Sequence, residues 1–178
     1  LETKELISKY KINFSDLEFF LPNDINLIRK NNIKQYFFGY FEKMQPQENF
    51  YKAAKITKFQ TSPERTEGTY SKYNSIDDKT DGFHYWTSYV KFGIGRATEE
   101  ASNELRHGYI TRDEAVNLVK KYDGEFPKKY FKEFLSLTNI SESEFYEIVD
   151  SFRPDHLWKK VGNDYRYGKN WQLKNLLK

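Results

Sequence analysis

The sequence contains no cysteine among its 178 residues and only one methionine. The lack of cysteine excludes a disulfide framework, a zinc site built from thiolates and a thiol nucleophile. It agrees with a reducing compartment, and we expect a cytoplasmic protein. No apolar run approaches the roughly 20 residues of a membrane-spanning helix. The stretch from Leu1 to Tyr10 mixes charged with apolar residues and does not form a signal peptide.

Charge of one sign is also scarce, because the net charge is only +3. Lysines and glutamates are interspersed, which is typical of solvated helix faces and does not favour an RNA-binding or other nucleic-acid-binding domain. The sequence lacks a P-loop, an H-E-x-x-H pair and a dinucleotide-binding fingerprint. The three histidines, His84, His107 and His156, are scattered, so we expect no metal site.

Aromatic residues are abundant, at 18% of the chain, so rings rather than long aliphatic runs build the core. Helical spacing and capping boxes at Ser15/Glu18, Thr111/Glu114 and Ser141/Glu144 predict a mainly α fold. The predicted helices are several short ones within residues 1–31, then 47–55, 83–92, 97–106, 111–122, 127–138 and 141–152. At most one or two short strands are expected near 35–41, which is an aromatic run. The tail after Pro154 reads as irregular, with Trp158 and Trp171 as candidates to dock on a partner.

Two regions follow from this pattern. Residues 1–56 read as a helical connector with the aromatic strand, and residues 57–178 as a helical C-terminal region. Residues 57–82 have no period and are longer than ordinary loops, which indicates an ordered loop that presents side chains.

Charged residues and glycines concentrate between Pro63 and Arg112. Lys91 and Arg96 flank a short glycine stretch before a predicted helix, where an anion would meet free backbone amides. Two exposed cations are the plainer alternative. Glu104 and Arg106 lie two residues apart on one helix and therefore point to different faces, so one can face a site or both can form structural ion pairs.

An aromatic patch follows the loop and consists of Tyr85, Trp86, Tyr89 and Phe92. Such rings stack on sugars or nucleobases, but they are more often part of a hydrophobic core. The sequence leaves both interpretations open.

Four segments together resemble the N-acetyl sugar amidotransferase family of O-antigen, pseudaminic acid and legionaminic acid pathways. They cover nearly the whole chain, and the second is highly specific. They are YFFGYFEKMQPQENFYKA (36–53), the stretch 62–130 with its GRATEEASNELR, EFYEIVDSF (144–152) and HLWKK (156–160).

The resemblance implies an asparagine-synthetase-like ATP pyrophosphatase of the PP-loop type that uses ATP with Mg²⁺. Its members convert a sugar acetamido group to an acetamidino group through an adenylylated intermediate. Ammonia comes from a partner glutaminase similar to that of the histidine pathway, with a cyclase-like barrel subunit. The S-G-G-x-D-S loop that grips ATP is absent, so the resemblance places the α/β nucleotide-binding domain before Leu1 and leaves this chain as the helical C-terminal part.

The resemblance also suggests site residues. Glu104 and Arg106 match the Glu-x-Arg helix of asparagine synthetase, and Lys91 and Arg96 are the natural cations for leaving pyrophosphate. The expected catalytic residues are therefore Lys91, Arg96 and Glu104. The expected sugar contacts are Glu64, Arg65, Glu67, Tyr70, Lys72, Asp81, His84 and Arg106. A docking or oligomerisation module for the glutaminase, without catalytic side chains, is the alternative.

Overall fold

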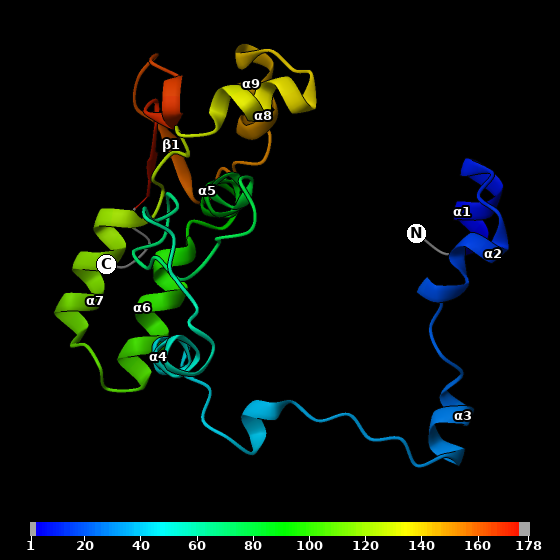
Figure 1. Ribbon diagram of the computed structural model, residues 1–178. Helices are drawn as coiled ribbons and strands as arrows, with labels where there is room; N and C mark the ends of the chain where they lie inside the picture. The colour runs from blue at the N-terminus through cyan, green and yellow to red at the C-terminus, as the bar shows by residue number, and fades with distance from the viewer. Residues whose placement is uncertain (1–2, 175–178) are drawn as a thin grey trace. The chain divides into compact units, whose positions relative to one another are not determined.

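The computed structural model describes residues 3–174 and is mainly helical (Figure 1), which confirms the predicted fold class. The elements are α1 (Thr3–Tyr10), α2 (Phe14–Leu17), η1 (Glu18–Phe20), α3 (Ile25–Lys30), η2 (Phe38–Tyr40), α4 (Pro46–Thr57), α5 (Asp81–Phe92), α6 (Arg96–Arg106), α7 (Arg112–Tyr122), α8 (Phe131–Thr138), α9 (Glu142–Asp150), β1 (Trp158–Lys160), η3 (Arg166–Gly168) and β2 (Trp171–Leu173).

The chain divides into two compact units, Leu1–Met44 and Gln45–Lys178. The division lies twelve residues before the predicted boundary at 56, because α4 belongs to the second unit. Gln45 is buried at the start of α4, and the Phe50 ring stacks on Tyr73 at 4.9 Å. Every buried residue that the structure describes lies between Gln45 and Asn170.

The first unit consists of short helices, as predicted, but residues 35–41 do not form a strand. Residues 38–40 form the 3-10 turn η2 instead. A strand needs a partner for its backbone groups, and the aromatic run has none within the described residues. Its rings are exposed, from 59% at Tyr36 to 85% at Phe37.

The core of the second unit is aromatic, as the composition predicts. Phe83, Trp86 and Val90 recur at helical spacing on α5 and pack against Phe145 and Val149 of α9. The Phe83 ring stacks on Phe134 of α8 at 4.1 Å. Pro127 does not begin α8, which starts four residues later at Phe131.

Helices α6 and α7 lie side by side (Figure 1). Ala97 and Ala101, one turn apart on α6, are fully buried, and their small side chains allow close approach of the backbones. The capping boxes predicted at Thr111/Glu114 and Ser141/Glu144 form with both of their hydrogen bonds. The one predicted at Ser15/Glu18 does not, because α2 begins at Phe14 with Asn13 at its N-cap.

The tail contains a small antiparallel hairpin rather than irregular structure only, because β1 pairs with β2 in the register Trp158↔Leu173. Trp158 is buried in the chain's own fold, and its indole N–H donates to the Val90 carbonyl at 2.7 Å. That hydrogen bond fixes Trp158 against the last turn of α5. Because the ring is buried there, the expected docking of Trp158 on a partner is wrong. No helix in the described part of the chain has the length and apolar character that crossing a bilayer requires.

Candidate functional site

The loop between α4 and α5 has no regular structure, yet it is held in place by its own hydrogen bonds. The Ser62 amide donates to the Lys72 carbonyl at 3.0 Å, and Lys72 Nζ donates back to the Pro63 carbonyl at 2.9 Å. Thr66 Oγ1 donates to the Ser75 carbonyl at 3.3 Å. These bonds fold the loop back on itself and fix the side chains that it presents.

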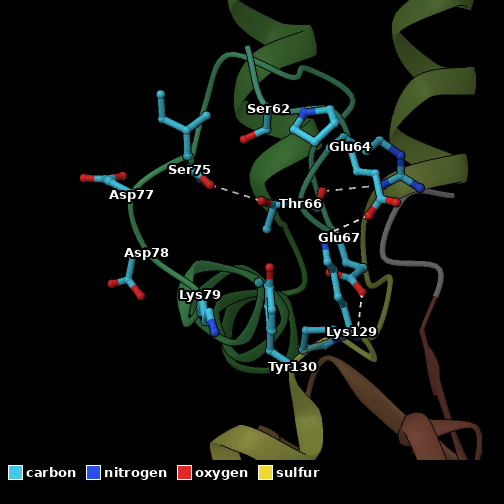
Figure 2. A pocket seen from close by; sticks show the side chains of 15 residues that line it. Ser62, Glu64, Thr66, Glu67, Ser75, Asp77, Asp78, Lys79, Lys129 and Tyr130 are labelled. Carbon is cyan, nitrogen blue, oxygen red and sulfur yellow. Dashed lines mark hydrogen bonds and ion pairs between the residues drawn. The ribbon is translucent and has the colours of Figure 1, made fainter. Parts of the chain in front are cut away.

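This loop forms one side of a groove with a volume of about 350 Å³, which we call the loop groove (Figure 2). Figure 2 shows Lys129 and Tyr130 at its base and Asp77 and Asp78 at the outer bend of the loop. The lining residues are Ser62, Pro63, Glu64, Arg65, Thr66, Glu67, Ser75, Ile76, Asp77, Asp78, Lys79, Gly82, Pro127, Lys129 and Tyr130. Of the expected sugar contacts, the structure brings Glu64, Arg65 and Glu67 into this groove.

Ion pairs join the loop to the segment between α7 and α8. Arg65 forms a two-pronged pair with Glu125 at 2.5 and 2.7 Å, and its guanidinium lies 4.7 Å from the Tyr122 ring. Glu64 pairs with Lys129 Nζ at 2.8 Å, and Glu67 accepts from the Lys129 amide at 3.0 Å. The lining carries four carboxylates against three cations, and two of the cations, Arg65 and Lys79, pair with glutamates outside it. The groove is therefore rich in acceptors, which suits the hydroxyls of a polyhydroxyl ligand.

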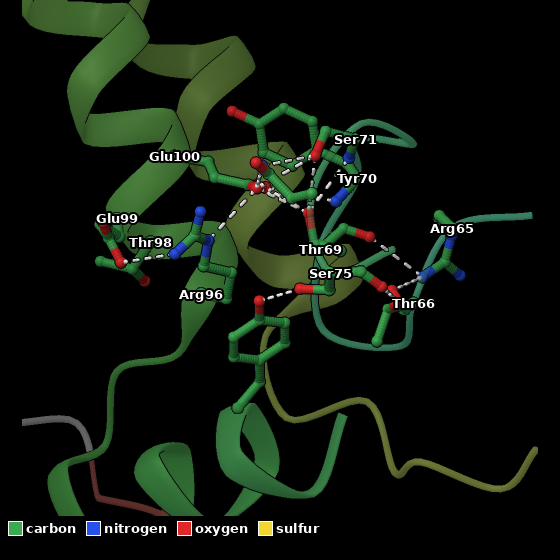
Figure 3. Close-up of polar contacts among 12 residues, drawn as sticks. Arg65, Thr66, Thr69, Tyr70, Ser71, Ser75, Arg96, Thr98, Glu99 and Glu100 are labelled. Atoms are coloured by element: carbon green, nitrogen blue, oxygen red, sulfur yellow. Dashed lines mark hydrogen bonds and ion pairs between the residues drawn. The ribbon is translucent and has the colours of Figure 1, made fainter. Parts of the chain in front are cut away.

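Behind the loop, Glu100 of α6 collects hydrogen bonds from the loop (Figure 3). Thr69 Oγ1 lies 2.6 and 2.7 Å from the two Glu100 oxygens, and Asn74 Nδ2 donates at 2.7 Å. Ser71 Oγ adds a bond at 3.3 Å, and Arg96 Nε one at 3.4 Å. Because the Glu100 side chain is only 10% exposed, this network fixes the loop against α6.

Arg96 and Glu104 meet at a small cavity beside this network. The cavity has a volume of about 30 Å³ and lies between α6, the loop and the start of α4. Its Gln45 Nε2 and Asn103 Oδ1 atoms are buried without a hydrogen-bond partner in the described part of the chain. Two unpaired polar atoms around a space of about one water molecule indicate a bound water or a molecule of similar size.

Burial raises the pKa of Glu104, and the negative charge of Glu100 acts in the same direction. The Tyr70 hydroxyl lies close enough to lower the Glu104 pKa in part, although their geometry falls short of a full hydrogen bond. Burial also raises the pKa of Tyr73, to about 12. Glu104 therefore binds a proton more readily than an exposed glutamate does.

The start of α6 is occupied by a carboxylate of the chain itself. Asp123, at the end of α7, accepts from the Gly95 amide at 2.9 Å, from the Thr98 amide at 3.2 Å and from the Thr98 hydroxyl. The glycine stretch was expected to leave these amides free for a ligand anion, but the Gly95 and Thr98 amides are bonded to Asp123 instead. An external phosphate here would have to displace Asp123.

The remaining predicted residues are spread around the second unit. Lys91 is exposed in the last turn of α5 and does not line the cavity that holds Arg96 and Glu104. Arg96 also pairs with Glu99 at 3.4 Å. The other members are Lys72, bound to the loop backbone, Asp81, the first residue of α5, and His84 and Arg106, both exposed. Whether any of them contacts substrate stays a prediction.

Sequence reasoning missed the residues that build the site from a distance. Glu100, Asp123 and Glu125 each bind a segment at least 25 residues away. Only Glu100 carried a local signal, since it lies one turn before Glu104 and shares its helix face.

Comparison with protein families adds an independent observation. Residues 67–175, more than half of the chain, match the model described as LPS biosynthesis protein WbpG-like, C-terminal domain. The chain belongs to this WbpG-like family. The match covers the hairpin and the groove lining from Glu67 onward, whereas the lining residues at 62–66, with Glu64 and Arg65, precede it. No curated protein matches the chain. The family therefore assigns the protein to lipopolysaccharide biosynthesis.

Proposed function

We propose that the chain is the C-terminal segment of an ATP-dependent amidotransferase that converts a sugar N-acetyl group to an acetamidino group. The amide oxygen attacks the α-phosphorus of ATP and pyrophosphate leaves. Glutamine-derived ammonia then adds to the activated carbon, which loses AMP together with the former amide oxygen. The product belongs to a surface glycan, an O-antigen or a flagellin glycan.

The observation that carries this proposal is the WbpG-like match over residues 67–175, since proteins of lipopolysaccharide biosynthesis handle sugars. The loop groove supports it by its size and chemistry. A volume of about 350 Å³ falls in the range of small-ligand sites, roughly 300–1,000 Å³. Carboxylates such as Glu64 and Glu67 accept hydrogen bonds from sugar hydroxyls, and the Tyr130 ring offers an apolar wall.

The described residues do not provide a cradle for the phosphates of ATP. The amides at the start of α6 are bonded to Asp123, and Arg96 is paired with Glu99 and Glu100. We therefore place the nucleotide and its Mg²⁺ on a segment that precedes Leu1. In this proposal Lys91 and Arg96 are the cations that approach the leaving pyrophosphate, and Glu104 shares its cavity with Arg96 but not with Lys91.

Steady-state kinetics of a longer protein that includes the preceding segment test the groove. Glu64→Gln removes an exposed carboxylate that lines it, and Glu133→Gln removes an exposed one, also paired with a lysine, that does not. Loss of a charged hydrogen bond predicts that Glu64→Gln raises the KM for the sugar by about tenfold. Equal KM values in the two variants would show that the sugar does not bind in the loop groove.

A docking module for the glutaminase is the second candidate, and the first unit favours it. Phe37, Phe38 and Tyr40 are between 66% and 85% exposed, and exposed rings of this density mark interaction surfaces. The double substitution Phe37→Ser/Phe38→Ser separates the roles. It should abolish turnover with glutamine and leave turnover with free ammonia unchanged if these rings bind the glutaminase.

A further inference from the structure

A second pocket lies between α5 and the C-terminal hairpin. Its volume is about 380 Å³, and we call it the tryptophan pocket. The chain has three tryptophans, and all of them, Trp86, Trp158 and Trp171, line this pocket. Tyr89, Arg153 and Gln172 supply polar groups to its wall.

Arg153 is the unusual member of this wall. Its side chain is only 3% exposed, and its guanidinium lies between two indoles, 4.8 Å from the Trp158 ring and 5.4 Å from the Trp171 ring. Nε donates to Asp150 at 2.8 Å. Within the described residues, the two terminal nitrogens make no hydrogen bond. Neither nitrogen is among the fully buried atoms without a partner, so both reach the space of the pocket, where they can donate to a bound acceptor.

The two indoles on the wall cannot accept from these nitrogens, because an indole N–H only donates, and both already have acceptors. The Trp158 indole binds the Val90 carbonyl, and the Trp171 indole donates to Asp150 at 3.0 Å. Asp123, the carboxylate among the lining residues, caps α6. The walls are therefore fixed in advance, and the free donors of Arg153 remain.

Gly168 keeps the floor of the pocket open. It has a positive φ of +70°, and a Cβ at this position would lie 2.9 Å from Arg153 Nη2 and 3.2 Å from the Trp86 ring. A side chain here would push the guanidinium out of its place between the indoles. The backbone thus leaves room at the terminal nitrogens, the part of Arg153 that is without a partner.

We propose that the tryptophan pocket binds an anionic sugar, a pyranose ring carrying a carboxylate or a phosphate, with the anion on Arg153. A guanidinium fork matches both oxyanions. Aromatic walls with few polar groups are typical of small-ligand pockets, and the Tyr89 hydroxyl and Gln172 amide suit sugar hydroxyls. Burial lowers the pKa of Arg153, and the Asp150 carboxylate only partly opposes this shift. A bound anion would add to the effect of Asp150 and raise the pKa of Arg153.

This site is separate from the loop groove and does not depend on the amidotransferase proposal. It depends on the family's place in lipopolysaccharide biosynthesis, which makes sugars the natural ligands, and on Arg153, which selects the charged ones. A nucleobase, which would stack on the rings without needing Arg153, is an outcome of the test.

Intrinsic fluorescence tests the proposal directly, because every tryptophan of the chain lines the pocket. The probes are glucuronic acid, glucose 1-phosphate, neutral glucose and uridine, titrated into the 178-residue chain at constant ionic strength. We expect a saturable change with one or both acids and binding of glucose weaker by about tenfold, the effect of losing a charged hydrogen bond. Whichever of the two acids binds more tightly shows whether the pocket prefers a carboxylate or a phosphate.

Two substitutions assign the response. Arg153→Met keeps the apolar stem and should bring the acids to the level of glucose, with near-ultraviolet circular dichroism as the check on folding. Gln172→Glu places a negative charge at the exposed rim and should weaken acid binding. Gln60→Glu makes the same change at an exposed position outside the pocket lining and should leave binding unchanged.

Comparison of Gln172→Glu with Gln60→Glu tests the tryptophan pocket as the binding site even when Arg153→Met does not fold. Equal binding of glucose and the acids would overturn the proposal, as would equal acid affinity in these two variants. A uridine response stronger than that of both acids would replace the anionic sugar by a nucleobase.

Discussion

Asp123 caps the start of α6, although it lies at the end of α7, 25 or more residues away in the chain. Asp123→Ala would leave the Gly95 and Thr98 amides without this acceptor. Because loss of a helix cap costs about 1–2 kcal/mol, the free energy of unfolding in urea should fall by that amount. Asp123→Asn keeps an acceptor oxygen and should lose less. Equal losses in both variants would show that the carboxylate acts through its charge alone.

Glu125 links stability to pH through its pair with Arg65. Burial would raise its pKa, but the hydrogen bonds from Arg65 and the Gly68 amide outweigh that effect, so the pKa of Glu125 lies below its usual value. The unfolded chain therefore takes up the proton first as pH falls below about 4.5. Glu125 thus stabilises the fold above this pH, and its contribution is lost as pH falls toward the lower folded value.

Glu125→Gln tests this linkage. It should lower the free energy of unfolding at pH 7 by about 1–3 kcal/mol, because a charged hydrogen bond is lost. As pH falls below about 4.5, the variant should lose less stability than the wild type, as followed by urea midpoints. The control Glu133→Gln removes an exposed pair and should change stability by less than about 1 kcal/mol. A pH profile of Glu125→Gln parallel to the wild type would contradict the linkage.

Among the elements, the C-terminal hairpin depends on a single buried ring. Trp158→Phe would remove the indole donor and leave the Val90 carbonyl at the end of α5 without a partner, at a cost of about 1–3 kcal/mol. Trp171→Phe is the matched control, since Trp171 is less buried and Asp150 keeps its bond to Arg153. Thermal unfolding of both variants provides the comparison. A larger loss of thermal stability in Trp171→Phe would show that the hairpin is held mainly through Trp171 of β2.

The helices could be predicted where their signals are local. The capping boxes at Thr111 and Ser141 lie within four residues of their partners and form as the sequence indicates. The hairpin could not be predicted, because its strands have three residues each and its stability comes from Trp158 reaching α5. The aromatic run at 35–41 misled for the opposite reason: strand propensity describes packing on a sheet, and no sheet is formed there by the described residues.

The candidate site divides in the same way. Glu64, Arg65 and Glu67 could be placed in a substrate loop from composition and resemblance, and the structure brings these three into one groove. Lys129 and Tyr130 at its base come from another part of the chain. A ligand anion was expected at the start of α6, whereas the structure has Asp123 there, whose position depends on how α7 ends beside α6. Contacts of this range depend on tertiary packing and leave no spacing in the sequence.

For the whole molecule, all buried residues that the structure describes lie in the second unit. We therefore predict that residues 45–178 alone unfold cooperatively in urea, with a free energy within about 1 kcal/mol of that of the full chain, since exposed segments contribute little. Near-ultraviolet circular dichroism should retain the signal of the aromatic core. A broad transition without cooperativity would show that residues 1–44 complete the core.

The central claim is that this chain serves ATP-dependent amidination of an N-acetyl sugar in lipopolysaccharide biosynthesis. The most direct measurement gives the longer protein ATP, ¹⁵N-ammonium and an N-acetyl sugar, and follows both AMP and the sugar by mass spectrometry. The account predicts AMP formed in step with a sugar that has gained ¹⁵N in place of its amide oxygen. AMP release that does not depend on the sugar, or a sugar that returns unlabelled, would contradict it.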